Sequence, residues 1–186
     1  MDNGADSYRR FLDGDDSGFT EIVRDYKDAL ILYLVSFVGS IDTAEELAED
    51  TFVKLGLKKP RFAGKSSFKT WLYAIGRNTA IDHIRKNAKH SPVSLEECEE
   101  LAEADMELLE NACIREERKI VLHRTMQKLK TEYRQVLWLL YFEGFSAKEA
   151  AKIMRKKAHG IETLAYRARK SLKAELLREG FRDEDL

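Results

Sequence analysis

The sequence is 186 residues long, 44% hydrophobic and 35% charged, which allows one sizeable core or two small ones and excludes a disordered chain. No apolar run reaches the roughly 20 residues of a membrane-spanning helix, and the polar start lacks the apolar core of a signal peptide. We therefore expect a cytoplasmic protein that does not insert into a membrane, and with two prolines and ten glycines we expect mostly helix.

The formal net charge of −1 is the sum of large blocks of opposite sign. The net charge is −8 over residues 1–57, +8 over 58–90, −9 over 91–117, +11 over 118–178 and −3 over 179–186. Two basic blocks with an acidic spacer suit a protein that contacts phosphates at two places, because each neutralised phosphate releases counterions. The acidic blocks would repel DNA, so they fit a protein partner, shielding of the basic blocks, or plain solvated surface.

The acidic first block predicts two amphipathic helices. Residues 19–38 place apolar side chains at helical spacing, namely Phe19, Ile22, Val23, Tyr26, Leu30, Tyr33, Leu34 and Phe37. Asp42 or Thr43 is expected to cap the next helix, which runs to Lys58. We expect this helix to expose its carboxylates and to bury Ala44, Leu47, Ala48, Thr51, Phe52 and Leu55.

The first basic block begins with a break in the helical pattern. Pro60 and Gly64 interrupt it, and Ser66 or Ser67 is expected to cap a third helix over residues 68–87.

Aromatic residues and cations alternate over residues 60–86. This mixture suits single-stranded DNA, because unpaired bases stack on rings while cations neutralise the backbone. Taken singly, Phe68 and Trp71 fit a core position better than a stacking position. Asn78 is the better candidate base reader, since its amide can pair with a base edge.

Residues 88–111 are acidic and weakly periodic, and we interpret them as a linker with room for a short helix. A further helix is expected from about residue 114 to residue 130, and it leads into residues 131–145.

Residues 145–172 hold two apolar-periodic stretches joined by three basic residues, Arg155 to Lys157. Ser146 and Glu149 have the spacing of a capping box, so a helix begins there and buries Ala150, Ala151, Ile153 and Met154. The second stretch begins near Ala158 and carries Ile161, Leu164, Ala165, Ala168 and Leu172.

Two such helices joined by a short turn have the dimensions of a helix-turn-helix, whose second helix enters the major groove of DNA. Its recognition end would be residues 157–167. An ordinary helical hairpin with a solvated basic face is the alternative that these residues leave open.

No residue pattern predicts chemistry at a metal or a nucleophile. Cys98 and Cys113 lack metal-ligand spacing and are interpreted as reduced thiols, and the four histidines are dispersed. Without clustered carboxylates or a nucleophile paired with a base, we expect no enzymatic activity, no metal and no cofactor.

Several motifs together resemble the extracytoplasmic-function sigma factors, small bacterial sigma subunits of RNA polymerase. They are TAEELAEDTFVKL, FAGKSSFKTWLYAIGRNTAIDHIRK, LKTEYRQVLWLLYFEGFSAKEAAKIM and YRARKSL. The resemblance covers residues 8 to 178 and implies an all-α fold with two small domains joined by an acidic linker. The implied bounds are 1–90 for sigma domain 2, 91–113 for the linker, 114–178 for sigma domain 4 with its helix-turn-helix, and 179–186 for a charged tail.

The resemblance also implies roles for particular residues. Contacts to core RNA polymerase are expected from Glu45, Glu46, Glu49, Asp50 and Phe52. Contacts to the −10 promoter element are expected from Phe62, Lys65, Ser66, Ser67, Lys69, Arg77, Asn78, Arg85 and Lys86. Contacts to the −35 element are expected from Lys156, Lys157, His159, Glu162, Thr163, Tyr166, Arg167 and Lys170.

Some residues depart from the family pattern. Arg155 stands at a turn position often held by glycine, Glu162 where the recognition helix often has Arg or Lys, and Leu140 where some members place an Arg that contacts DNA. The preferred −35 sequence is therefore open. Glu49 replaces a common Gln and is expected to keep polymerase docking.

The expected function is that of an alternative sigma factor, with core RNA polymerase, promoter DNA and an anti-sigma factor as partners. The main alternative is a helix-turn-helix regulator that binds duplex DNA without polymerase, which leaves the aromatic and basic segment unexplained. An enzyme that acts on nucleic acid is a third, weaker alternative.

Overall fold

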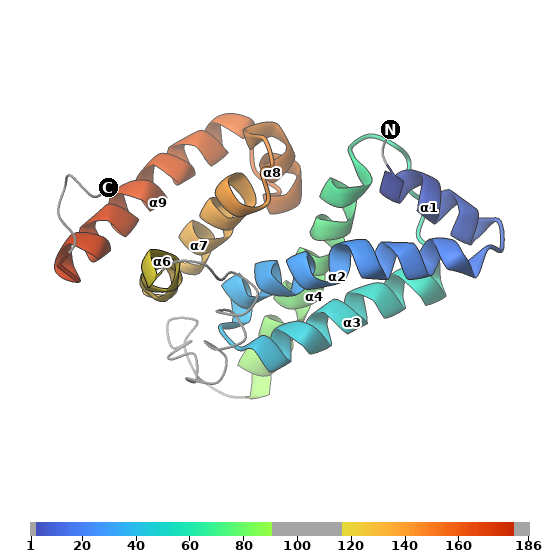
Figure 1. The fold of residues 1–186 in the computed structure, drawn as a ribbon, viewed down its shortest axis with the longest axis horizontal. Coiled ribbons are helices and arrows are strands. Elements are labelled where there is room, and N and C mark those ends of the chain that lie inside the picture. The colour runs from blue at the N-terminus through green and yellow to red at the C-terminus, as the bar shows by residue number, and fades with distance from the viewer. Residues whose placement is uncertain (1–2, 91–116, 181–186) are drawn as a thin grey trace.

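The computed structural model describes residues 3–90 and 117–180, and every regular element within these ranges is a helix (Figure 1). The helices form an N-terminal unit and a C-terminal unit, which confirms the predicted all-helical fold with two small domains. None of the described helices is long and apolar enough to cross a membrane. The predicted acidic linker, residues 91–113, lies outside the described residues.

The N-terminal unit consists of α1 (Asn3–Leu12), α2 (Asp16–Val38), α3 (Ile41–Lys58) and α4 (Phe68–His90). Helix α2 lies at its centre and contacts the other three. The core gathers the expected apolar faces, with fully buried Leu30, Tyr33 and Leu34 from α2, Leu47 and Leu55 from α3, and Phe68, Leu72 and Tyr73 from α4. Burial of one such side chain contributes roughly 1.5–3 kcal/mol, so these faces hold the unit together.

The starts of α3 and α4 are set by serine caps. Ser40 caps α3, because its hydroxyl accepts a hydrogen bond from the Thr43 backbone N–H at 3.3 Å. The predicted caps Asp42 and Thr43 are therefore wrong; Ile41 is buried and belongs to the first turn of the helix. Ser67 accepts from the Thr70 backbone N–H at 3.2 Å at the start of α4, which confirms one of the two predicted caps.

The C-terminal unit consists of α6 (Glu117–Gln127), α7 (Thr131–Leu137), the π-helical turn η1 (Trp138–Phe142), α8 (Ala147–Met154) and α9 (Ala158–Arg178). The capping box is confirmed, since Ser146 and Glu149 each accept from the other's backbone N–H, at 3.3 Å and 3.0 Å. The predicted buried stripe of α8 is also confirmed, with Ala150, Ala151, Ile153 and Met154 all buried.

The turn between α8 and α9 contains a strained residue. Arg155 has φ of 54°, in the left-handed region where glycine is favoured, and it ends α8. Lys156 then donates its backbone N–H to the Ala151 carbonyl at 2.9 Å. The chain thus makes the tight turn of a helix-turn-helix without a glycine.

The two units lie against each other, with α4 contacting α8 and α2 contacting α7 (Figure 1). The buried Arg134 guanidinium of α7 donates from Nε to the Ser36 carbonyl of α2 at 3.1 Å and from Nη1 to the Gln127 carbonyl at 2.8 Å. These bonds satisfy a charge that would be costly to bury alone. Tyr73 and Phe145 pack edge to face across the same boundary, with ring centroids 5.1 Å apart.

Candidate nucleic-acid interface

The loop of residues 59–67, which joins α3 to α4, carries the first group of predicted site residues. It passes twice through the left-handed region, at Lys59 with φ of 42° and at Gly64 with φ of 66°. Lys65 is exposed and Ser66 is half-buried. Phe62 is half-buried, and its ring centroid lies 5.7 Å from that of Phe68 and 5.1 Å from that of Trp71. The loop therefore surrounds one partly exposed ring with short polar side chains and a cation.

Phe68 and Trp71 lie at the start of α4, beneath this loop. Phe68 is fully buried, which confirms that it belongs to the core. Trp71 is half-buried and packs on the core, with its ring centroid 5.5 Å from that of Phe68. Both rings pack against the Phe62 ring.

Further along α4, Arg77 and Asn78 are half-buried and Arg85 and Lys86 are exposed. Among the described residues, no hydrogen-bond partner is found for the buried Nε of Arg77, and burial lowers the pKa of the Arg77 guanidinium. Arginine is a residue type that pairs with phosphate, although the buried Nε is not itself accessible to one. Helix α4 thus carries, after the loop, the amide of Asn78 together with the three cations Arg77, Arg85 and Lys86.

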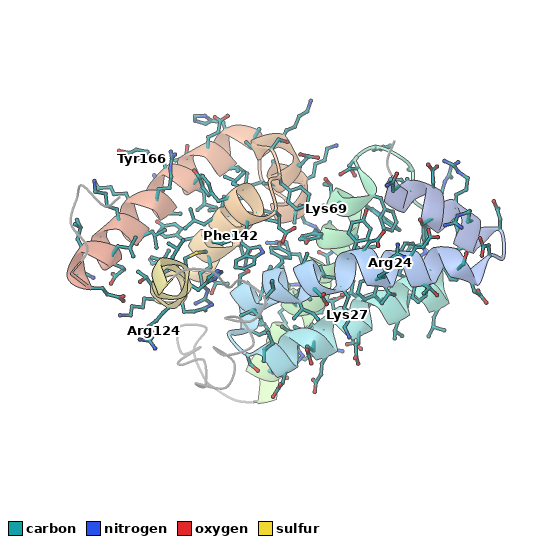
Figure 2. All side chains as sticks on the ribbon, viewed as in Figure 1. Arg24, Lys27, Lys69, Arg124, Phe142 and Tyr166 are labelled. Atoms are coloured by element: carbon teal, nitrogen blue, oxygen red, sulfur yellow. The ribbon has the colours of Figure 1, made fainter. Side chains whose placement is uncertain are left out.

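The start of α9 carries the second group of predicted residues, and most of them face solvent. Thr163 is half-buried and donates its hydroxyl to the His159 carbonyl at 3.0 Å. Tyr166 is 62% exposed on the outer side of α9 (Figure 2). Exposed side chains accompany it, namely Lys157, His159, Glu162, Arg167 and Lys170. This surface is therefore open to solvent.

Lys156 and Glu162 make ion pairs of different kinds at this surface. Lys156 is exposed and pairs with Glu132 of α7, with Nζ and Oε1 2.9 Å apart. The Glu162 carboxylate lies 3.7 Å from Nδ1 of His159, a contact that is ionic only when the imidazole is protonated. The Glu162 side chain is 64% exposed, so this contact leaves its oxygens accessible.

The outer face of α3 carries the predicted acidic group. Glu45, Glu46, Glu49 and Asp50 are all exposed. Phe52 is only 6% exposed, so its side chain lies in the core and its predicted place on a contact surface is wrong. Val53 and Leu57, which are 52% and 82% exposed, continue the acidic face instead. An apolar end beside a charged face is typical of a protein-binding surface.

A contact centred on Glu143, which follows η1, joins the C-terminal unit to α4. Lys69 Nζ lies 2.8 Å from the Glu143 carboxylate and 3.1 Å from the Glu143 carbonyl oxygen. Tyr73 donates its hydroxyl to the same carboxylate at 2.8 Å, and Trp138 donates Nε1–H at 3.3 Å. Figure 2 shows Lys69 at the boundary between the units. We call this group the Glu143 contact.

The Glu143 contact is largely dry. The Glu143 side chain is 8% exposed, and burial, together with the neighbouring carboxylate, raises the pKa of Tyr73. The Tyr73 hydroxyl therefore stays protonated and remains a donor. In this arrangement Lys69, a predicted −10 contact, is bound to the C-terminal unit.

Helix α8 also covers part of the loop of residues 59–67. Lys152 donates from Nζ to the Lys65 carbonyl at 2.6 Å, and Thr70 donates its hydroxyl to Glu149 at 3.4 Å. The predicted −10 residues therefore lie in the loop of residues 59–67 and along α4, and the C-terminal unit contacts them at Lys65 and Lys69. The −35 residues lie on α9 and in the turn before it. This turn is close to α4, since Arg155 and Glu132, the partner of Lys156, act electrostatically on Arg77.

Sequence reasoning missed three features of the structure: helix α1, the apolar end of the exposed face of α3, and the Glu143 contact. It predicted no helix over residues 3–12, although Tyr8 and Phe11 have helical spacing there. It overlooked Val53 and Leu57, whose four-residue spacing continues the exposed face of α3. It gave no role to Glu143, because the two partners of Glu143 in the N-terminal unit, Tyr73 and Lys69, are 70 and 74 residues away in the sequence.

A helix-turn-helix in one unit and an aromatic, basic loop in the other define a DNA-binding protein with two contact surfaces. Residues 22–90 match the family model of Sigma-70 region 2, and residues 119–172 match that of Sigma-70, region 4. The chain belongs to the extracytoplasmic-function sigma factors.

Individual relatives agree with this membership. The chain is 31% identical over 166 residues to the RNA polymerase sigma-H factor of Pseudomonas aeruginosa. This alignment covers 86% of each protein. The chain is also 30% identical over 164 residues to the ECF RNA polymerase sigma factor SigM of Bacillus subtilis. This alignment covers 88% of this chain and 98% of SigM. The sigma factor RpoE, solved in complex with the anti-sigma factor NepR from Bartonella quintana, has the same fold. Its TM-score is 0.65 at 23% identity, over 85% of this chain and 96% of that one.

Proposed function

We propose that the chain is an alternative sigma factor that binds core RNA polymerase, directs it to specific promoters and has no catalytic activity of its own. In this proposal residues 1–90 dock on core polymerase, read the −10 element and help to open the duplex. Residues 114–178 read the −35 element, residues 91–113 connect the two, and residues 179–186 form a charged tail.

The observation that carries the proposal is the order of three surfaces along one chain: an exposed acidic helix face, an aromatic and basic loop, and a helix-turn-helix. A helix-turn-helix regulator that acts without polymerase accounts for the third surface alone. In vitro transcription from supercoiled templates separates the two functions. Purified chain added to bacterial core polymerase on a supercoiled genomic library should yield discrete new transcripts, whereas a regulator without polymerase docking yields none.

For the −10 element, we propose that Phe62 and the loop through Lys65, Ser66 and Ser67 hold an extruded base and that Asn78 reads its edge. An extruded base needs a ring to stack on and a donor and acceptor pair to face, and this region offers both. Phosphates beside the base would be held by the cations of α4, Lys69, Arg77, Arg85 and Lys86.

Replacing Asn78 with alanine is expected to remove roughly 1–3 kcal/mol of discrimination between the preferred −10 base and its variants, because one base-reading pair is lost. The measurement compares transcription from promoters that differ at single −10 positions. Asn87→Ala is the matched control, since Asn87 is an exposed asparagine on the same helix whose side chain bonds to His83. Loss of core binding in Asn78→Ala would instead make Asn78 a structural residue.

For the −35 element, we propose that the exposed face of α9 enters the major groove, with Glu162 as a base reader and the cations as phosphate contacts. The contact residues would be Lys156, Lys157, His159, Glu162, Thr163, Tyr166, Arg167 and Lys170. A carboxylate cannot pair with phosphate or with the acceptor edge of guanine, but it accepts a hydrogen bond from cytosine N4.

Replacing Glu162 with arginine is expected to shift the preferred −35 base from cytosine toward guanine, because arginine pairs with the acceptor edge of guanine. Selection of sites from a randomised −35 region with both proteins measures this shift. Glu175→Arg makes the same charge change further along α9 and should leave the consensus unaltered. If Glu162→Arg only tightens binding to every sequence and steepens the salt dependence, Glu162 does not read a base.

For core polymerase, we propose that the outer face of α3 is the docking surface, made of Glu45, Glu46, Glu49 and Asp50 together with Val53 and Leu57. We also propose an anti-sigma factor as a partner, because RpoE shares the fold and was solved with one. The protein would act where core polymerase acts, in the cytoplasm.

A further inference from the structure

Helix α1, which precedes the segment matched to Sigma-70 region 2, is held against the N-terminal unit by two close backbone approaches. A Cβ on Gly18 of α2 would lie 2.2 Å from the Ser7 carbonyl oxygen of α1. A Cβ on Gly4 would lie 2.5 Å from both the Phe68 ring and the Tyr26 hydroxyl. A side chain at Gly18 would push α1 away from α2, and one at Gly4 would require the Phe68 ring and the Tyr26 hydroxyl to move, so both glycines allow the close packing of α1.

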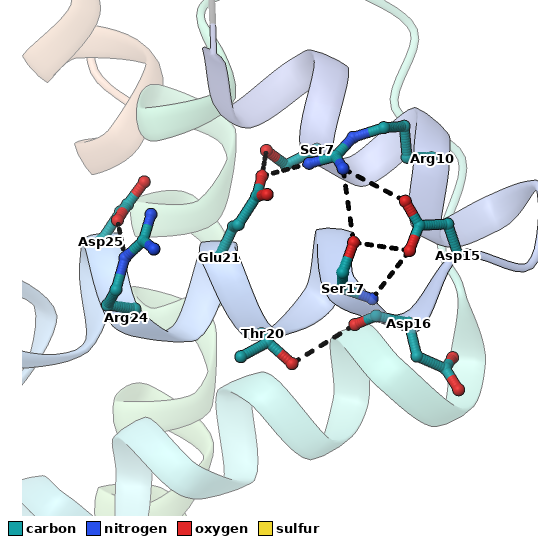
Figure 3. A network of polar contacts seen from close by, with 9 residues as sticks. All are labelled: Ser7, Arg10, Asp15, Asp16, Ser17, Thr20, Glu21, Arg24 and Asp25. Carbon is teal, nitrogen blue, oxygen red and sulfur yellow. Dashed lines mark hydrogen bonds and ion pairs between the residues drawn. The ribbon is translucent and has the colours of Figure 1, made fainter.

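A network of polar side chains fixes the same helix at its exposed edge (Figure 3). Ser7 donates its hydroxyl to Glu21 of α2 at 2.7 Å, and Arg10 pairs with the same carboxylate. Arg10 also donates to Asp15 at 3.1 Å, and Asp15 in turn caps α2 by accepting from the Ser17 backbone N–H at 3.0 Å. Because the network ties α1 to the cap of α2, it sets the rotation of α1.

From this fixed position α1 reaches the loop of residues 59–67. Tyr8 donates its hydroxyl to the Pro60 carbonyl at 2.7 Å, and Lys59 Nζ lies 4.4 Å from the centroid of the Phe11 ring. Tyr8 is only 1% exposed, and burial raises its pKa to about 12, so the hydroxyl is a permanent donor at neutral pH.

The Tyr8 ring also lies under the aromatic group that supports the loop. Its centroid is 5.5 Å from that of Phe68 and 5.4 Å from that of Trp71, the two rings on which Phe62 packs. Tyr8 therefore contacts the loop directly through its hydroxyl at Pro60, and it contacts on α4 the two rings that pack on Phe62.

Lys152, which comes from the C-terminal unit, also donates to the backbone of this loop, at the Lys65 carbonyl. The Tyr8 bond differs from it because both of its partners lie within the N-terminal unit, so it does not depend on the contact between the units.

We propose that Tyr8 is a positioning residue for −10 recognition: α1 sets the place of the loop of residues 59–67, and so of the extruded base, through the Tyr8 hydroxyl. This inference rests on the proposed role of that loop in −10 reading. It extends the reading site to a helix that does not itself contact DNA.

Tyr8→Phe tests the proposal, because it keeps the rings and removes one hydrogen bond. Holoenzyme formed from full-length chain and core polymerase is assayed on promoters that differ at single −10 positions. We expect discrimination between −10 bases to fall about threefold to tenfold, as for the loss of one hydrogen bond, with unchanged affinity for core polymerase and unchanged −35 preference. Tyr33→Phe is the matched control, since the buried Tyr33 hydroxyl has no hydrogen-bond partner among the residues that the structure describes.

Asn78→Ala assayed in parallel separates the two possible failures. If Asn78→Ala lowers −10 discrimination and Tyr8→Phe does not, the loop reads DNA without help from α1 and the inference is overturned. If neither variant lowers it, the proposed −10 role of this surface itself is wrong. An equal fall in core binding, −35 preference and −10 discrimination in Tyr8→Phe also overturns the inference, because Tyr8 would then serve only the stability of the unit.

Discussion

Replacing Glu143 with alanine is expected to separate the two units and to expose the −10 surface of the free protein. The substitution removes a carboxylate that binds Lys69, Tyr73 and Trp138 at once, in a site where its side chain is 8% exposed. Breaking one partner of a buried ion pair costs roughly 3 kcal/mol, which corresponds to about a 100-fold shift toward the separated arrangement.

Two measurements check this shift. The radius of gyration from small-angle X-ray scattering should increase, and affinity for a single-stranded −10 oligonucleotide should rise because Lys69 and the loop become accessible. Glu175→Ala is the matched control, since it breaks an ion pair with Arg178 within α9 and should change neither value. An unchanged radius in Glu143→Ala would mean that the other contacts across the boundary, such as the Arg134 bond to Ser36 and the packing of Tyr73 on Phe145, are enough to hold the units together.

Reversing the charges of Glu45 and Glu46 to lysine is expected to lower the affinity for core polymerase by about 10- to 100-fold. Like charges brought together at an interface cost several kcal/mol and slow the encounter, and both residues are fully available to a partner on the outer face of α3. Competition with labelled wild-type chain for a limiting amount of core polymerase measures the effect.

The control for this pair is the reversal of two acidic residues away from the docking surface. Asp13 and Asp28 are exposed outside α3, and Asp13→Lys with Asp28→Lys makes the same change in net charge. Equal competition by the Glu45 and Glu46 double variant would show that this face is only solvated surface. Equal loss in both double variants would trace the effect to net charge.

The helix-turn-helix could be predicted from the sequence because the residues that determine it are close together in the chain. Ser146, Glu149 and the apolar spacing of α8 all lie within nine residues, and each local preference agrees with the final fold. Phe52 illustrates the same point: its spacing predicted burial and the family resemblance predicted a contact, and its 6% exposure agrees with the spacing.

Features that depend on tertiary contacts were not predictable in this way. Residues 3–12 are mostly polar, and α1 is held by Gly18 and by residues of α2, which a local pattern does not reveal. At the start of α3, Ser40, Asp42 and Thr43 are all capping residue types, and the burial of Ile41 decides between them. The Glu143 contact likewise joins residues from two units.

The most direct test of the central claim is permanganate probing of thymines in a promoter that the chain and core polymerase transcribe from the genomic library. With core polymerase and wild-type chain, thymines in the −10 element should become reactive, and the reactivity should fall when either the chain or core polymerase is omitted. In Asn78→Ala the same positions should react weakly at the preferred promoter. A duplex that the chain binds without core polymerase, and that stays closed when both proteins are present, would contradict the account and favour a regulator that acts without polymerase.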